Sequence, residues 1–130
     1  MLSGPVHTIL IVEDEPLIGL DVQEGLESAG FETLFVACPF EATALLEAGV
    51  TAFAGLITDI RLGTTITGWD VARAARRKAP GFPVVYMSGD SAIDHRIHGV
   101  PDSVMIQKPF VIAQIVTAIT GLLNGLPVRP

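Results

Sequence analysis

Two kinds of hydrophobic pattern alternate along this chain. Short apolar runs rich in β-branched residues are typical of strands, and segments with apolar residues every three or four positions are typical of amphipathic helices. Strands are expected at residues 8–12, 31–36, 53–58, 83–87 and 104–106. Helices are expected at residues 16–29, 39–48, 68 or 69 to 78, 91–99 (a weak pattern) and 110–124. Such alternation predicts βαβ units, and therefore an α/β fold with a parallel sheet covered by helices on both faces.

Composition limits the class of protein. With 130 residues, 49% hydrophobic and 17% charged, the chain is expected to form one globular domain over residues 1–130. Its core should cover about residues 7–124, between short flexible tails. The lack of a linker-like polar tail favours a complete protein over one domain of a longer regulator.

Charge and cysteine content exclude several functions. A net charge of −6 disfavours direct binding to nucleic acid. No apolar stretch approaches the ~20 residues that a membrane span needs, so no membrane contact is expected. A single cysteine, Cys38, excludes an internal disulfide and a multi-cysteine metal site, which fits a cytoplasmic location.

Chemically useful side chains follow four of the five predicted strands. Glu13 and Asp14 come after the first strand, Asp59 after the third, Ser88 after the fourth and Lys108 after the fifth. Each has an ordinary alternative: acids suit helix starts, Asp and Ser-Gly suit turns, and lysine suits a surface. Because parallel strands end at one edge, where such sheets bind ligands, their joint occurrence favours a functional site.

Phosphoryl transfer to a carboxylate would use this set of residues. Neighbouring carboxylates repel one another unless a cation lies among them, and oxygen ligands suit a divalent metal held by Asp14 and Asp59. Asp59 would attack phosphorus and form an acyl phosphate. Lys108 would place a positive charge on one phosphoryl oxygen, and Ser88 would donate a hydrogen bond to another. Glu15 is interpreted as a helix-start residue.

The motifs Glu13-Asp14 after ILIV, Asp59 after GLIT, Ser88-Gly89 after VVYM, and Lys108-Pro109-Phe110 occur in this order. With them the chain, from about His7 to Asn124, resembles the receiver domain (CheY-like) of two-component response regulators. The resemblance implies a doubly wound, flavodoxin-like, five-stranded sheet of order 2-1-3-4-5. It also implies Mg²⁺ as cofactor and Asp59 as phosphoacceptor for the phosphohistidine of a histidine kinase or phosphotransfer protein.

The resemblance also implies the remaining site. The backbone carbonyl of Arg61 would complete the protein ligands of the metal, Glu13 would act through water, and the Lys108–Pro109 bond would be cis. Such a protein is not an enzyme towards separate substrates, because it catalyses only its own phosphorylation and dephosphorylation. It would change its binding to an unknown downstream output protein.

Two features depart from the family pattern. Met105 stands where receivers usually carry the Tyr or Phe of their switch, and Met has no ring to turn. The loop after Asp59 lacks the usual proline, and Gly68 comes one residue later than usual. Partner docking, including a possible homodimer, is expected on the face from Ser91 to Asn124.

Other interpretations stay open. A degenerate receiver that binds partners without phosphorylation is the alternative that Met105 favours. An aspartyl-phosphate phosphatase is disfavoured, because such enzymes usually carry a second acid two residues after the nucleophile, where this chain has Arg61. His95 and His98 are interpreted as surface residues rather than relay groups, and Tyr86 is assigned no role.

Overall fold

One parallel sheet organises the computed structural model, which describes residues 7–89 and 92–125. The expected tails, at 1–6 and 125–130, lie outside the described residues except for Gly125, and so does Ser91 at the start of the expected docking face. The strand order is β2-β1-β3-β4-β5, which confirms the predicted order and fold class. The strands are β1 (Thr8–Val12), β2 (Glu32–Val36), β3 (Gly55–Asp59), β4 (Val84–Ser88) and β5 (Val104–Gln107).

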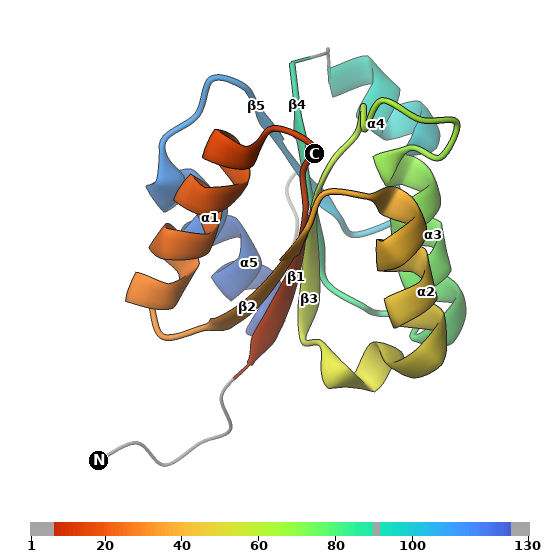
Figure 1. The fold of residues 1–130 in the computed structure, drawn as a ribbon, viewed down its shortest axis with the longest axis horizontal. Coiled ribbons are helices and arrows are strands. Elements are labelled where there is room, and N and C mark those ends of the chain that lie inside the picture. Colours follow the sequence, from red (N-terminus) through yellow and green to blue (C-terminus); the bar gives the residue numbers. More distant parts are fainter. Residues whose placement is uncertain (1–6, 90–91, 126–130) are drawn as a thin grey trace.

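Helices cover both faces of this sheet, as the alternating pattern predicts. They are α1 (Pro16–Ser28), α2 (Pro39–Gly49), α3 (Gly68–Lys78), α4 (Ala92–His98) and α5 (Ile112–Leu123), with a 3₁₀ turn at Val50–Ala52. Helices α1 and α5 lie on one face, and α2, α3 and α4 lie on the other (Figure 1). The predicted helices are therefore all present, with ends that differ by a few residues.

The third strand differs most from its predicted bounds. Phe53 was expected to start it, but the Phe53 N–H donates to the carbonyl of Val50 and closes the 3₁₀ turn. Strand β3 therefore begins at Gly55, and it runs on to Asp59, which pairs with Met87 of β4. Asp59 is thus held within the sheet rather than in the loop that follows it.

Alternate residues of the inner strands build a separate core on each face. In β1, Ile9 and Ile11 pack towards the side of α1 and α5, whereas Leu10 and Val12 pack towards α2 and α3. All five residues of β3 are buried, which confirms that this strand is covered on both faces. A sheet packed on both sides gives the residues at its C-terminal edge a rigid base.

Helix α3 begins close against the end of β3. A Cβ atom added to Gly68 would overlap the carbonyl oxygen of Asp59 and would lie 2.9 Å from the Cα of Ile60. Thr67 caps the helix in a reciprocal capping box with Asp70. The chain between Ile60 and Thr67 is therefore fixed at both ends beside Asp59.

Candidate functional site

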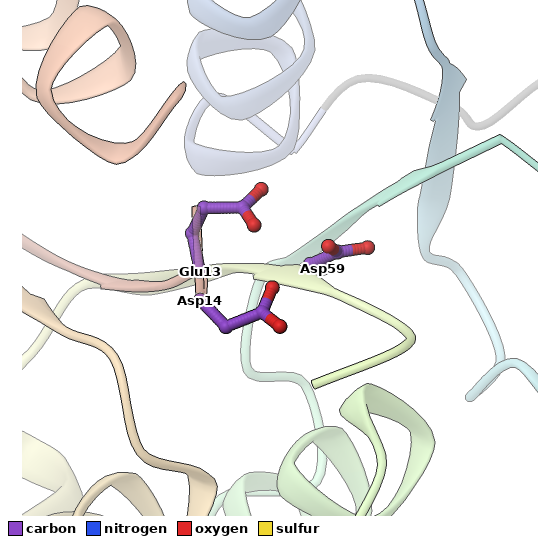
Figure 2. A group of neighbouring side chains, drawn as sticks. All are labelled: Glu13, Asp14 and Asp59. Carbon is purple, nitrogen blue, oxygen red and sulfur yellow. The ribbon is translucent and has the colours of Figure 1, made fainter. Parts of the chain in front are cut away.

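Three carboxylates gather where β1 and β3 end. One oxygen from each of Glu13, Asp14 and Asp59 lies within 4.8 Å of the others. Glu13 and Asp14 leave the chain on opposite sides, and Asp59 extends from the neighbouring strand (Figure 2). Glu13 is fully buried and Asp59 is nearly so, whereas Asp14 is exposed. The predicted acids are therefore brought together, in unequal environments.

Lys108 joins the two buried acids. Its Nζ lies 3.2 Å from Oε1 of Glu13 and 3.1 Å from Oδ2 of Asp59, and 3.9 Å from the exposed Glu15. Lys108 follows β5, and its N–H donates to the carbonyl of Ser88 at 2.7 Å. The bond from Lys108 to Pro109 is cis, as the resemblance implies. The ammonium group is thus positioned by two strand ends.

Backbone amides complete the hydrogen bonding of both buried carboxylates. The second oxygen of Glu13 accepts from the Glu15 N–H at 3.0 Å. The second oxygen of Asp59 accepts from the Ile60 N–H at 2.7 Å. A buried carboxylate is costly unless its oxygens are paired, so these amides make the close acid pair tolerable.

Burial and charge shift two ionisation equilibria. Burial raises the pKa of Glu13 to about 7, and the charge of Asp59 adds to the rise, while the Glu15 amide and Lys108 oppose it. For Lys108, burial acts to lower the pKa, but the hydrogen bonds and charges of Asp59 and Glu13 outweigh burial and raise it. Lys108 is therefore held as a cation inside an acidic cluster.

A hollow of about 380 Å³ opens above these groups. Its lining residues are Asp14, Glu15, Asp59, Arg61, Ser88, Gly89 and Lys108. The hollow thus brings together five of the predicted site residues. Glu13 lies buried beside it, and Met105 is not part of it but packs against the core on the α2 and α3 side.

The donor set fits a hard divalent cation. Asp14 and Asp59 present carboxylate oxygens to the hollow, and Mg²⁺ binds such oxygens while keeping several waters. Glu13 leaves the chain on the side opposite Asp14, and its carboxylate bonds Lys108 and the Glu15 amide. Of the three clustered acids, Asp14 and Asp59 are therefore the ones that line the hollow.

A second cluster, beside α4, was not anticipated. Tyr86 is fully buried, and its hydroxyl accepts from the Val100 N–H at 3.1 Å. Its ring centroid lies 4.6 Å from that of Trp69 and 5.6 Å from that of His95. The expected surface position is wrong for His95, because its ring packs on Tyr86 and its Nε2 lies 2.8 Å from the hydroxyl of Ser103. The one sequence signal was a tyrosine inside an otherwise apolar strand.

Comparison with known proteins identifies the class. The chain belongs to the response regulator receiver domain family, whose model matches residues 9–120. It is therefore a receiver domain of the response regulators of two-component systems. Among the described residues, no helix has the length and apolar character to cross a membrane.

Two transcriptional regulators illustrate the degree of sequence identity to known relatives. Transcriptional regulatory protein CusR of Escherichia coli (strain K12) is 30% identical over 119 residues, which are 89% of this chain and 51% of CusR. Probable transcriptional regulatory protein SilR of Salmonella typhimurium is 31% identical over 119 residues, 89% of this chain and 50% of SilR. The chain thus spans about half the length of these relatives.

Solved structures support the fold. A response regulator receiver protein from Sinorhizobium medicae WSM419 is 42% identical, with a TM-score of 0.88 over 92% of this chain and 95% of that one. A CheY-like receiver domain protein from Methanospirillum hungatei JF-1 is 23% identical, with a TM-score of 0.82 over 93% of this chain and 96% of that one. The second likeness shows the fold alone.

Proposed function

We propose that this receiver accepts a phosphoryl group on Asp59 from a phosphohistidine and that the modified protein binds its partners differently. The main observation in support is the position of Asp59, which lines the hollow with its carboxylate 3.1 Å from Nζ of Lys108. A nearly buried carboxylate beside a fixed cation is suited to forming and holding an acyl phosphate.

The proposed reaction forms one bond and breaks one. An oxygen of Asp59 attacks phosphorus, and the phosphorus–nitrogen bond of the phosphohistidine breaks with its electron pair returning to the imidazole. Lys108, which now faces Asp59 and Glu13, turns its charge to a phosphoryl oxygen. The Ser88 hydroxyl donates to another phosphoryl oxygen. The protein then acts only on itself, by gaining and losing this group.

Mg²⁺ is the proposed cofactor. Asp14, Asp59 and the backbone carbonyl of Arg61 would hold it, with Glu13 acting through water. When bound, the ion neutralises the negative charge of the acids and of the phosphoryl oxygens, so that an anionic carboxylate can approach an anionic donor.

The proposed phosphodonor is a histidine kinase or phosphotransfer protein, and the proposed location is the cytoplasm.

An apolar hollow of about 400 Å³ adjoins the site and shares Lys108 with it. Ile18, Phe110 and Ile112 also line this hollow. On the adjacent α1, Leu17 is 79% exposed. An exposed apolar surface beside a phosphoryl site fits a docking helix of the donor. The downstream output partner, and a homodimer through residues 91–124, remain predictions.

Intact mass spectrometry tests the assignment. The protein is incubated with phosphoramidate and Mg²⁺, and one added phosphate is expected. Asp59→Asn should stay unlabelled, whereas Glu24→Gln, which changes an exposed acid on α1 outside both hollows, should label as the wild type does. Labelling of Asp59→Asn would show that Asp59 is not the acceptor. If the wild type stays unlabelled, the degenerate, phosphorylation-independent receiver is the better account.

A further inference from the structure

Helix α4 and the loop that follows it, residues 99–103, contact α3 and the sheet. The helix has seven residues, and Arg96, Ile97 and His98 on it are exposed. Two arginines of α3 hold its C-terminal end: Arg73 donates to the carbonyl of His98 at 3.3 Å, and Arg76 donates to carbonyls of the loop. Trp69 of α3 also contacts this helix, with its ring centroid 5.8 Å from that of His98. A further contact comes from inside the sheet.

The contact from inside the sheet is made by Tyr86 of β4. Its hydroxyl accepts the buried N–H of Val100, at 3.1 Å, and its ring lies against His95 of α4. The loop itself is closed by Ser103, whose hydroxyl donates to the carbonyl of Val100. Since Ser103 has given its one proton, the neighbouring Nε2 of His95 is the donor in their contact. Helix α4 and the loop therefore form one hydrogen-bonded unit that rests on Tyr86.

Tyr86 is also close to the proposed phosphorylation site along its own strand. It lies two residues before Ser88, so the two side chains share a face of the sheet. Its backbone neighbours across the sheet are Thr58, one residue before Asp59, and Met105 of β5. The arginines that hold the loop stand instead on α3, away from the strand ends that line the hollow.

We propose that Tyr86 transmits the phosphorylation state of Asp59 to α4, and that its hydrogen bond to Val100 is released when Ser88 engages the phosphoryl group. The proposal rests on the proposed function. At 3.1 Å the bond is near the long end of its range, so a displacement of about 0.5 Å breaks it. Met105 carries neither a ring nor a hydroxyl, and so Tyr86 takes the coupling role on the neighbouring strand.

Amide hydrogen exchange of Val100, followed by NMR in the complete chain, tests this directly. Beryllofluoride with Mg²⁺ serves as the phosphoryl mimic. We expect the exchange rate of the Val100 amide to rise about fivefold in the wild type when the mimic binds, which is the size of a lost hydrogen bond. In Tyr86→Phe, which keeps the ring, the rate should be high with and without the mimic. Met105→Leu should respond as the wild type does.

The wild type offers a second measurement that needs no variant. Tyr86 is the only tyrosine in the sequence. In protein that carries 3-fluorotyrosine, one fluorine resonance should therefore shift when the mimic binds. The exchange of the Ile57 amide, in the buried β3, should not change beyond any difference in global stability.

The outcomes separate the two proposals. A wild type that is labelled on Asp59 but shows an unchanged Val100 exchange rate overturns the role of Tyr86 and leaves the proposed function standing. A full response in Tyr86→Phe, or its loss in Met105→Leu, also overturns it. Failure of the wild type to bind the mimic or to be phosphorylated counts against the proposed function itself.

Discussion

Gly68 starts α3 directly against the backbone that carries Asp59. Its N–H donates to the carbonyl of Ile60 at 2.8 Å, and a Cβ at this position would overlap the Asp59 carbonyl oxygen. The atoms in the way are backbone atoms of Asp59, the last residue of β3, and of Ile60, so no side-chain rotation relieves the overlap. Gly68→Ala should therefore push the start of α3 away from the site.

The size of the effect follows from two opposing terms. Overpacking a rigid site costs about 1–3 kcal/mol, and the upper half applies here because the obstacle is backbone. Replacing Gly with Ala returns about 0.4–1 kcal/mol, because the unfolded chain has less freedom to lose. We expect a net loss of about 2 kcal/mol in the free energy of unfolding. Asp59 phosphorylation should also become slower, since the acceptor moves.

Urea denaturation measures this loss. With a slope of about 2 kcal/mol/M, the midpoint should fall by about 1 M. Gly81→Ala is the matched control, because nothing lies within 4 Å of its added Cβ. The control should change the free energy of unfolding by no more than about 0.5 kcal/mol. If Gly68→Ala and Gly81→Ala have the same free energy of unfolding, the conclusion that α3 packs too closely on β3 to admit a Cβ atom is contradicted.

Three further predictions concern the site, the α3 cap and α4. Lys108→Met should slow labelling of Asp59 by phosphoramidate at least about tenfold, because a preorganised cation is lost; an unchanged time course in intact mass spectrometry would contradict this. Thr67→Ala should lower the urea-derived free energy of unfolding by about 1 kcal/mol, and Thr67→Ser should retain the cap. Burial lowers the pKa of His95 below its value in the unfolded chain. As the pH falls through about 6.5, the unfolded chain therefore binds the proton first, and the free energy of unfolding decreases. His95→Gln should therefore lose less stability between about pH 7.5 and 5.5, and an equal loss would contradict the shift.

The sequence pattern was sufficient to predict a parallel sheet with helices on both faces and the edge at which the candidate site lies, whereas the strand order came from the resemblance to receiver domains. The apolar run from Phe53 to Thr58 predicted a strand buried on both faces, and the parallel arrangement placed Asp59 and Lys108 at the same edge. These conclusions depend on local pattern and on a simple topological rule, so they need no knowledge of contacts.

Other features depend on contacts between distant parts of the chain. Glu13 and Asp14 are adjacent and equally charged, yet one is fully buried and the other exposed, because the end of β1 turns them to opposite sides. Tyr86 stands in a predicted strand, but its partner Val100 lies 14 residues away in a loop, so the sequence pattern does not indicate their hydrogen bond. The weak pattern of α4 does not indicate which side of the helix faces Tyr86, so the sequence does not predict that His95 packs there.

The central claim is that Asp59 is the acceptor, and chemical trapping of the acyl phosphate tests it most directly. The protein is treated with phosphoramidate and Mg²⁺, reduced with borohydride, and digested for peptide mass mapping. We predict that Asp59 is converted to homoserine, that the conversion needs Mg²⁺, and that Asp14 stays intact. Conversion of another residue, or an unmodified Asp59 in labelled protein, would contradict the account.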